Sequence, residues 1–113
     1  MHELALCQSV VDLLRREATA RQFSRVTLVR LQIGAFSCAS AEALEFCFEA
    51  VTKGTLAEGA HLDLVRVPGR AWCMNCGETV TIRERTDCCP QCGGYELNVT
   101  GGDELRVQEL EVL

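Results

Sequence analysis

Two Cys-x-x-Cys pairs, separated by twelve residues, constrain this chain more than any other feature. Thiolates at this spacing can surround one metal ion as a tetrahedron, and sites built from four cysteines are closed structural zinc sites. The predicted zinc ligands are Cys73, Cys76, Cys89 and Cys92. Because thiolates also bind iron, a rubredoxin-like iron site is the alternative for the same four residues.

Glycine follows each pair, at Gly77 and Gly93. Glycine adopts a positive φ without steric cost, so the chain can turn back beneath the metal at these positions. Cys88 stands directly before the second pair and could compete as a ligand. We favour Cys89, because the Cys-Pro-x-Cys-Gly sequence that it opens is better suited to a metal-binding turn, and we expect Cys88 to be a spectator thiol.

The composition narrows the class of protein. A length of 113 residues allows one ordinary domain or two small ones. Eleven basic and sixteen acidic residues give a formal charge of −5. This charge argues against nucleic-acid binding, which needs clustered Lys and Arg for the phosphates. A zinc loop of about 25 residues cannot bury a core of its own, so it needs its metal to fold.

Eight cysteines could indicate a secreted disulfide scaffold. The chain, however, shows no signal-peptide pattern and no apolar run near the roughly 18 residues that a membrane span needs. We therefore expect a cytoplasmic protein without membrane contact. Cys7, Cys38 and Cys47 are expected to be free thiols in apolar surroundings.

Hydrophobic periodicity predicts two helices and three strands. Apolar residues recur at helical spacing from residue 3 to residue 21, and again between Ser40, the expected N-cap, and Gly54, the expected residue after the helix. Alternating apolar and polar residues predict strands over residues 25–33, 61–67 and 105–112.

This order of elements predicts an α+β fold, in which two helices pack on a three-stranded sheet. A zinc-ribbon-like domain, residues 70–102, is inserted between the second and third strands. Residues 1–69 together with 103–113 form the expected α/β domain.

The N-terminus offers a second metal site. The α-amine of Met1, the backbone nitrogen of His2 and its imidazole can form adjoining five- and six-membered chelate rings, and Glu3 can add a backbone nitrogen or its carboxylate. Ni²⁺ and Cu²⁺ favour such square-planar nitrogen donors. The alternative interpretation is that these residues bind no metal, because His is a common enough second residue and Glu3 is an ordinary charge for the first turn of a helix.

No catalytic constellation is evident. Two histidines in the whole chain leave little for Ser/His or Cys/His chemistry, and there is no phosphate-binding glycine loop. A four-thiolate site has no open position for a substrate. We expect a protein that is not an enzyme.

The chain resembles the HypA/HybF hydrogenase-maturation proteins over essentially its whole length, and looks particularly close to the HybF-like branch. The matching motifs are Met1-His2-Glu3-Leu4, Leu6-Cys7-Gln8-Ser9, Ile33-Gly34-Ala35, Phe46-x-Phe48-Glu49, Gly54-Thr55, Glu58-Gly59-Ala60, the two Cys-x-x-Cys pairs and Glu109-Leu110-Glu111.

The resemblance implies a nickel metallochaperone for [NiFe]-hydrogenase maturation. It implies that Met1, His2 and Glu3 bind nickel in the α/β domain and that the four paired cysteines bind structural zinc. The implied partners are a maturation GTPase and the hydrogenase large-subunit precursor. The competing interpretation is a zinc-ribbon interaction adapter that handles no nickel.

Overall fold

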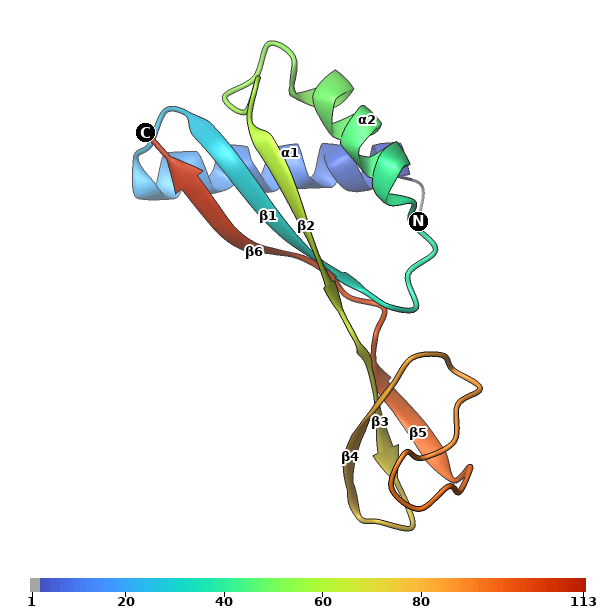
Figure 1. Cartoon of the computed structure of the whole chain (residues 1–113). Helices are drawn as coiled ribbons and strands as arrows, with labels where there is room; N and C mark the ends of the chain where they lie inside the picture. Colours follow the sequence, from blue (N-terminus) through green and yellow to red (C-terminus); the bar gives the residue numbers. More distant parts are fainter. Residues whose placement is uncertain (1–2) are drawn as a thin grey trace. The chain divides into compact units, whose positions relative to one another are not determined.

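The computed structural model describes residues 3–113, and Met1 and His2 lie outside the described residues. The described residues form the helices α1 and α2, a sheet of strand order β2-β1-β6 and a second sheet of strand order β4-β3-β5 (Figure 1). The elements are α1 (Glu3–Arg21), β1 (Val26–Gly34), α2 (Ala41–Thr52), β2 (His61–Val67), β3 (Gly69–Cys73), β4 (Glu78–Ile82), β5 (Leu97–Gly101) and β6 (Leu105–Val112). The α+β class, both helices and the three strands of the first sheet are confirmed.

The chain divides into two compact units. The first comprises Met1–Leu31, Cys38–Leu64 and Val107–Leu113, and the second comprises Gln32–Ser37 and Val65–Arg106. The second unit therefore contains the whole expected zinc-ribbon segment and a short stretch from the end of β1. The assignment of one metal to each part of the chain stays a prediction.

The core of the first unit lies between its two helices and β1. Buried residues recur along α1 at the predicted helical spacing, and Leu44 and Phe48 are the large buried side chains of α2. Val26, Val29 and Leu31 are the buried residues that the central strand β1 contributes to this unit. The buried Cys7 thiol donates to the backbone oxygen of Leu44 at 3.5 Å, which ties α1 to α2. Neither described helix has the length and apolar character needed to cross a bilayer.

Helix α2 begins and ends as its sequence predicts. The Ser40 side chain accepts a hydrogen bond from the backbone N–H of Ala43 at 3.4 Å, so Ser40 is the N-cap. Lys53 is the C-cap, and Gly54 follows it with a φ of 76°. This positive φ is the usual left-handed conformation after a helix.

One arginine joins all three strands of the first sheet on its polar face. Arg30, on the central strand, donates to Asp63 of β2 at 2.7 Å and to Glu109 of β6. One carboxylate from each neighbouring strand is thereby paired with the central strand.

The expected free thiols differ in their surroundings. Cys7 is buried and Cys47 is half-buried, but Cys38 is exposed. The expectation that Cys38 lies in apolar surroundings is therefore wrong. It follows β1 in a loop, where the local apolar composition says little about burial.

The second sheet is the feature that the periodicity analysis missed. Its central strand β3 pairs antiparallel with both neighbours. Gly69 and Cys73 lie opposite Ile82 and Glu78 of β4, and Arg70 and Cys73 lie opposite Gly101 and Leu97 of β5. Pro68 separates β2 from β3, as expected from its missing N–H donor. These strands are only five residues long, near the lower end of the roughly four to eight residues over which alternation indicates a strand.

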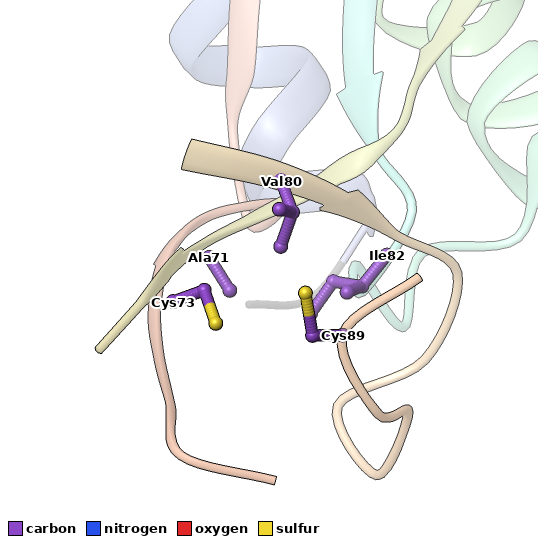
Figure 2. Close-up of a cluster of buried hydrophobic side chains, with 5 residues drawn as sticks. All are labelled: Ala71, Cys73, Val80, Ile82 and Cys89. Carbon is purple, nitrogen blue, oxygen red and sulfur yellow. The ribbon is translucent and has the colours of Figure 1, made fainter. Parts of the chain in front are cut away.

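The core of the second unit is small and includes two of the paired cysteines. Figure 2 shows the Cys73 and Cys89 side chains beside Ala71, Val80 and Ile82, and all five residues are buried. Such a limited apolar core supplies little stability by itself.

Residues 34–36 complete this unit from the end of β1. The Ala35 N–H donates to the Val67 carbonyl at 2.9 Å and the Phe36 N–H donates to the Gly102 carbonyl at 2.8 Å. The Phe36 ring lies against the backbone of Gly69 and Gly102, where any Cβ would overlap the ring. The same ring packs on the small apolar core.

Candidate metal centre

The four paired cysteines converge at one end of the second sheet. Cys73 ends β3 and Cys76 lies in the following turn, whereas Cys89 and Cys92 lie in the loop between β4 and β5. Their Sγ atoms all lie within 4.8 Å of one another. The Sγ atoms of Cys73 and Cys92 are 3.7 Å apart, and those of Cys76 and Cys89 are 3.8 Å apart.

These separations fit a tetrahedral zinc ion. A Zn–S distance of about 2.3 Å places thiolates about 3.8 Å apart along each edge of a tetrahedron. Two cysteines of the group are buried, Cys76 is half-buried and Cys92 is exposed, so the cluster lies at the border between core and solvent. The four-cysteine cluster therefore fits a structural zinc site.

Both metal-binding turns use the same backbone arrangement. The Gly77 N–H donates to the Cys73 carbonyl at 2.9 Å, and the Gly93 N–H donates to the Cys89 carbonyl at 2.8 Å. The φ values of Gly77 and Gly93 are 65° and 73°. The expected role of glycine after each pair is confirmed, because an L side chain is disfavoured at such angles.

Backbone amides stabilise negative charge on two of the sulfurs. The N–H groups of Cys76 and Gln91 donate to the Sγ atoms of Cys73 and Cys89, each at 3.4 Å. Hydrogen bonds from the backbone of Cys92 and then of Gln91 lower the pKa of the Cys89 thiol to about 7, against the opposing effect of burial. Donors of this kind orient metal ligands and tune their basicity.

The remaining thiols lie in different surroundings. Asn75 donates through Nδ2 to the Cys92 sulfur at 3.9 Å, a contact that the spacing of cysteines did not indicate. Loss of hydration, followed by hydrogen bonds with the neighbouring thiols, raises the pKa of Cys76 to about 12. Metal binding must therefore displace a proton at Cys76.

Among the described residues, Cys88 is not a member of the four-sulfur group. It is half-buried and directly precedes Cys89, whose side chain is buried beside Ile82. Adjacent residues direct their side chains differently, so the backbone that brings Cys89 into the group leaves Cys88 out of it. The geometry supports Cys89 rather than Cys88 as the ligand.

Of the three residues predicted to bind nickel, Met1 and His2 lie outside the described residues. Glu3 is the first residue of α1. Its Oε1 accepts a hydrogen bond from the backbone N–H of Ser40 at 3.3 Å. The start of α1 therefore lies against the start of α2, a long-range contact that the sequence pattern did not indicate.

Comparison with known families decides the class of protein. Residues 1–112 match the family model described as hydrogenase/urease nickel incorporation, metallochaperone, HypA. The chain belongs to this family. The resemblance drawn from the sequence motifs is thereby confirmed over nearly the whole chain.

Individual HypA proteins support this assignment. The chain is 56% identical to the hydrogenase maturation factor HypA of Azotobacter chroococcum mcd 1 and 54% identical to that of Azotobacter vinelandii. Each match spans 112 residues and covers 99% of both proteins. The solution structure of the nickel metallochaperone HypA from Helicobacter pylori matches with a TM-score of 0.76 at 25% identity, and covers 100% of this chain and 98% of the other.

Membership of the HypA family gives the two expected metals a context. Nickel is the metal that the family model and the Helicobacter pylori structure name, and the four-cysteine cluster is suited to structural zinc. Hydrogenase maturation is the role that the relatives' names give them. The family to which the chain belongs is thus described as a metallochaperone family.

Proposed function

We propose that this protein is a nickel metallochaperone that binds Ni²⁺ through Met1, His2 and Glu3 and helps to insert it into [NiFe]-hydrogenase large-subunit precursors. The observation that carries the proposal is the HypA match over residues 1–112. The chemistry of the N-terminus supports it, because an amine, an amide nitrogen and an imidazole are donors that Ni²⁺ accepts in a square plane.

Nickel is cargo in this proposal and must be released. A ligand set drawn from only the first three residues is small, which suits a metal that must be passed on to a partner. The imidazole of His2 binds only when neutral and the α-amine must lose its proton, so affinity falls as the pH decreases. Cu²⁺ would bind the same donors more tightly, so selectivity depends on metal supply and on the docked partner.

Zinc has a different role, as a resident structural ion. Cys73, Cys76, Cys89 and Cys92 are the proposed ligands, and four thiolates leave no coordination position for a substrate. When bound, zinc would hold the β3 end and the β4–β5 loop together. The protein is accordingly a carrier and not an enzyme.

The proposed setting is the cytoplasm. The partners are a maturation GTPase and the hydrogenase large-subunit precursor, which receives the nickel. No nucleic-acid or membrane partner is required.

A nickel titration of untagged, zinc-loaded protein tests the N-terminal site. The parent should bind one Ni²⁺ by calorimetry and absorption, and His2→Ala should lose this binding with the fold intact. His61→Ala is the matched control, because His61 is the only other histidine and lies exposed on β2. Equal binding by the parent and His2→Ala would refute the N-terminal site. Absence of binding in both would favour a zinc-ribbon adapter that handles no nickel.

A further inference from the structure

The outward side of α2 carries an exposed aromatic ring. Phe46 is 75% exposed, whereas Leu44 and Phe48 on the same helix are almost fully buried. Because residues three or four apart share one side of a helix, Phe46 shares its side with Glu42 and Glu49 rather than with the core residues. We call Glu42, Glu45, Phe46 and Glu49 the α2 outer surface, and all four side chains are exposed.

Nothing in the fold of the first unit requires a phenyl ring at position 46. The core is closed by the other side of α2, and an exposed large aromatic side chain adds no burial. A partner that covers such a ring removes a large apolar surface from water. Aromatic residues dominate the binding energy of many interfaces.

The three glutamates around this ring are also unpaired within the described chain. No ion pair or hydrogen bond joins the side-chain carboxylate of Glu42, Glu45 or Glu49 to another side chain of residues 3–113. Other carboxylates are paired, for example Asp63 and Glu109 with Arg30. Exposed carboxylates that ring an apolar side chain complement a basic surface.

A groove adjoins the α2 outer surface. It has a volume of about 430 Å³ and is lined by Glu45, Phe48, Glu49 and Thr52 from α2 and by His61 and Leu62 from β2. β2 is an edge strand of its sheet. A partner seated on Phe46 could therefore place basic side chains in a hollow that already has two carboxylates on its wall.

We propose that the α2 outer surface docks a protein that carries Arg and Lys residues around an apolar pocket of phenyl size. The position suits a partner in nickel transfer, because the Ser40 N–H at the start of α2 contacts Glu3 at 3.3 Å. The assignment of the docked protein to nickel transfer rests on the proposed function. Phe46 fills the pocket, and the glutamates steer the encounter and fix its orientation.

The test measures binding of the full-length, zinc-loaded protein to two purified probes, the maturation GTPase and the hydrogenase large-subunit precursor. Phe46→Ala should weaken binding to one of them by about thirtyfold, the effect of losing an interface hot spot. The double variant Glu45→Gln/Glu49→Gln should slow association with the same probe and reduce its dependence on salt. Tyr95→Ala is the matched control, since Tyr95 is an equally exposed aromatic residue elsewhere, at 75%.

The outcomes of this binding test can be distinguished from those of the nickel titration. Binding by Phe46→Ala that stays within about twofold of the parent for both probes would overturn the proposal. Failure of the parent to bind either probe would also overturn it, and a nickel titration of the same preparation shows whether nickel binding persists. A change in oligomeric state on sedimentation of Phe46→Ala would identify a second copy as the occupant and would likewise contradict the proposal. Circular dichroism confirms that each variant is folded.

Discussion

Adjacent residues 88 and 89 show how backbone direction separates two chemically identical side chains. The Cys89 sulfur lies with those of Cys73, Cys76 and Cys92, and its pKa is lowered to about 7 by the N–H groups of Cys92 and Gln91. Cys88 is half-buried and stands outside this group. The backbone direction of the turn therefore determines which of the two thiols can bind the metal.

Replacement of each cysteine by serine tests this distinction. Cys89→Ser should lose most of the bound zinc, because three thiolates remain and a serine hydroxyl is a poor ligand for zinc. Cys88→Ser should keep one zinc per chain. The zinc content of each variant is measured by elemental mass spectrometry after gel filtration. Loss of zinc in Cys88→Ser alone would show that Cys88 is the ligand.

Thiol reactivity should differ sharply between Cys7 and Cys38. Burial, followed by the charges of Cys47 and Glu3, raises the pKa of Cys7 to about 11, whereas Cys38 is exposed. The thiolate is the reactive form, so iodoacetamide at pH 8 should label Cys38 rapidly and Cys7 only after unfolding. Peptide mapping of the zinc-loaded protein measures both rates, and comparable labelling of the two thiols in the folded protein would contradict this expectation.

The same pKa shift has a definite sign for stability. The folded state favours the neutral Cys7 thiol, so its contribution is fully present below the pKa of the unfolded thiol, about 8.5. The contribution is lost as the pH rises through the folded pKa of about 11. Alkaline conditions should therefore loosen the contact of α1 with α2.

At the scale of elements, the Phe36 ring packs where β3 begins and β5 ends. The ring lies against Gly69, where β3 begins, and against Gly102, after β5. The Arg85 guanidinium lies 4.8 Å from the ring centroid and donates to both carboxylate oxygens of Asp103, at 2.6 and 2.7 Å. The ring is therefore enclosed by backbone and by an arginine that is itself held in place.

Gly69→Ala should destabilise the second unit by about 1–3 kcal/mol, the usual cost of overpacking. The new Cβ would overlap the Phe36 ring, which also lies against the Gly102 backbone and beside the Arg85 guanidinium. Urea unfolding of zinc-loaded protein measures the effect. The double variant Phe36→Ala/Gly69→Ala removes the overlap, so the added cost of alanine at position 69 should be much smaller in that background. An equal cost in both backgrounds would exclude the ring as the cause.

At the scale of the whole molecule, the two units depend on metal to different degrees. The first unit has two helices and a three-stranded sheet, with many fully buried apolar side chains. The second has a core of five buried residues, and two of these are Cys73 and Cys89. A core of this size depends on its metal ligands for stability.

Removal of zinc should therefore unfold the second unit and leave the helices of the first. Chelation, or Cys73→Ala, should abolish amide protection in β3, β4 and β5 but preserve the helical circular dichroism of α1 and α2. Hydrogen exchange with peptide resolution locates the change. Protection that persists in β3–β5 of a zinc-free preparation would show that the metal is dispensable, and loss of the helices would show that the units unfold together.

Features that depend on neighbouring residues could be predicted before the fold was known. Helical spacing predicted α1 and α2, Ser40 and Gly54 predicted the limits of α2, and the Cys-x-x-Cys-Gly turns predicted the sulfur cluster. Each of these follows from a repeat or a conformational preference within a few residues. The family resemblance carried by the N-terminal and cysteine motifs was confirmed in the same way, from the sequence itself.

Contacts between residues far apart in the chain became visible only in the packed fold. It placed Phe36 against Gly69 and Gly102, brought Glu3 to the N–H of Ser40, and left Phe46 exposed beside three glutamates. Strands β3–β5 also depend on partners far along the chain, because five residues without cross-strand hydrogen bonds have no stable extended form. Burial and long-range pairing are properties of the packed chain, so no local pattern specifies them.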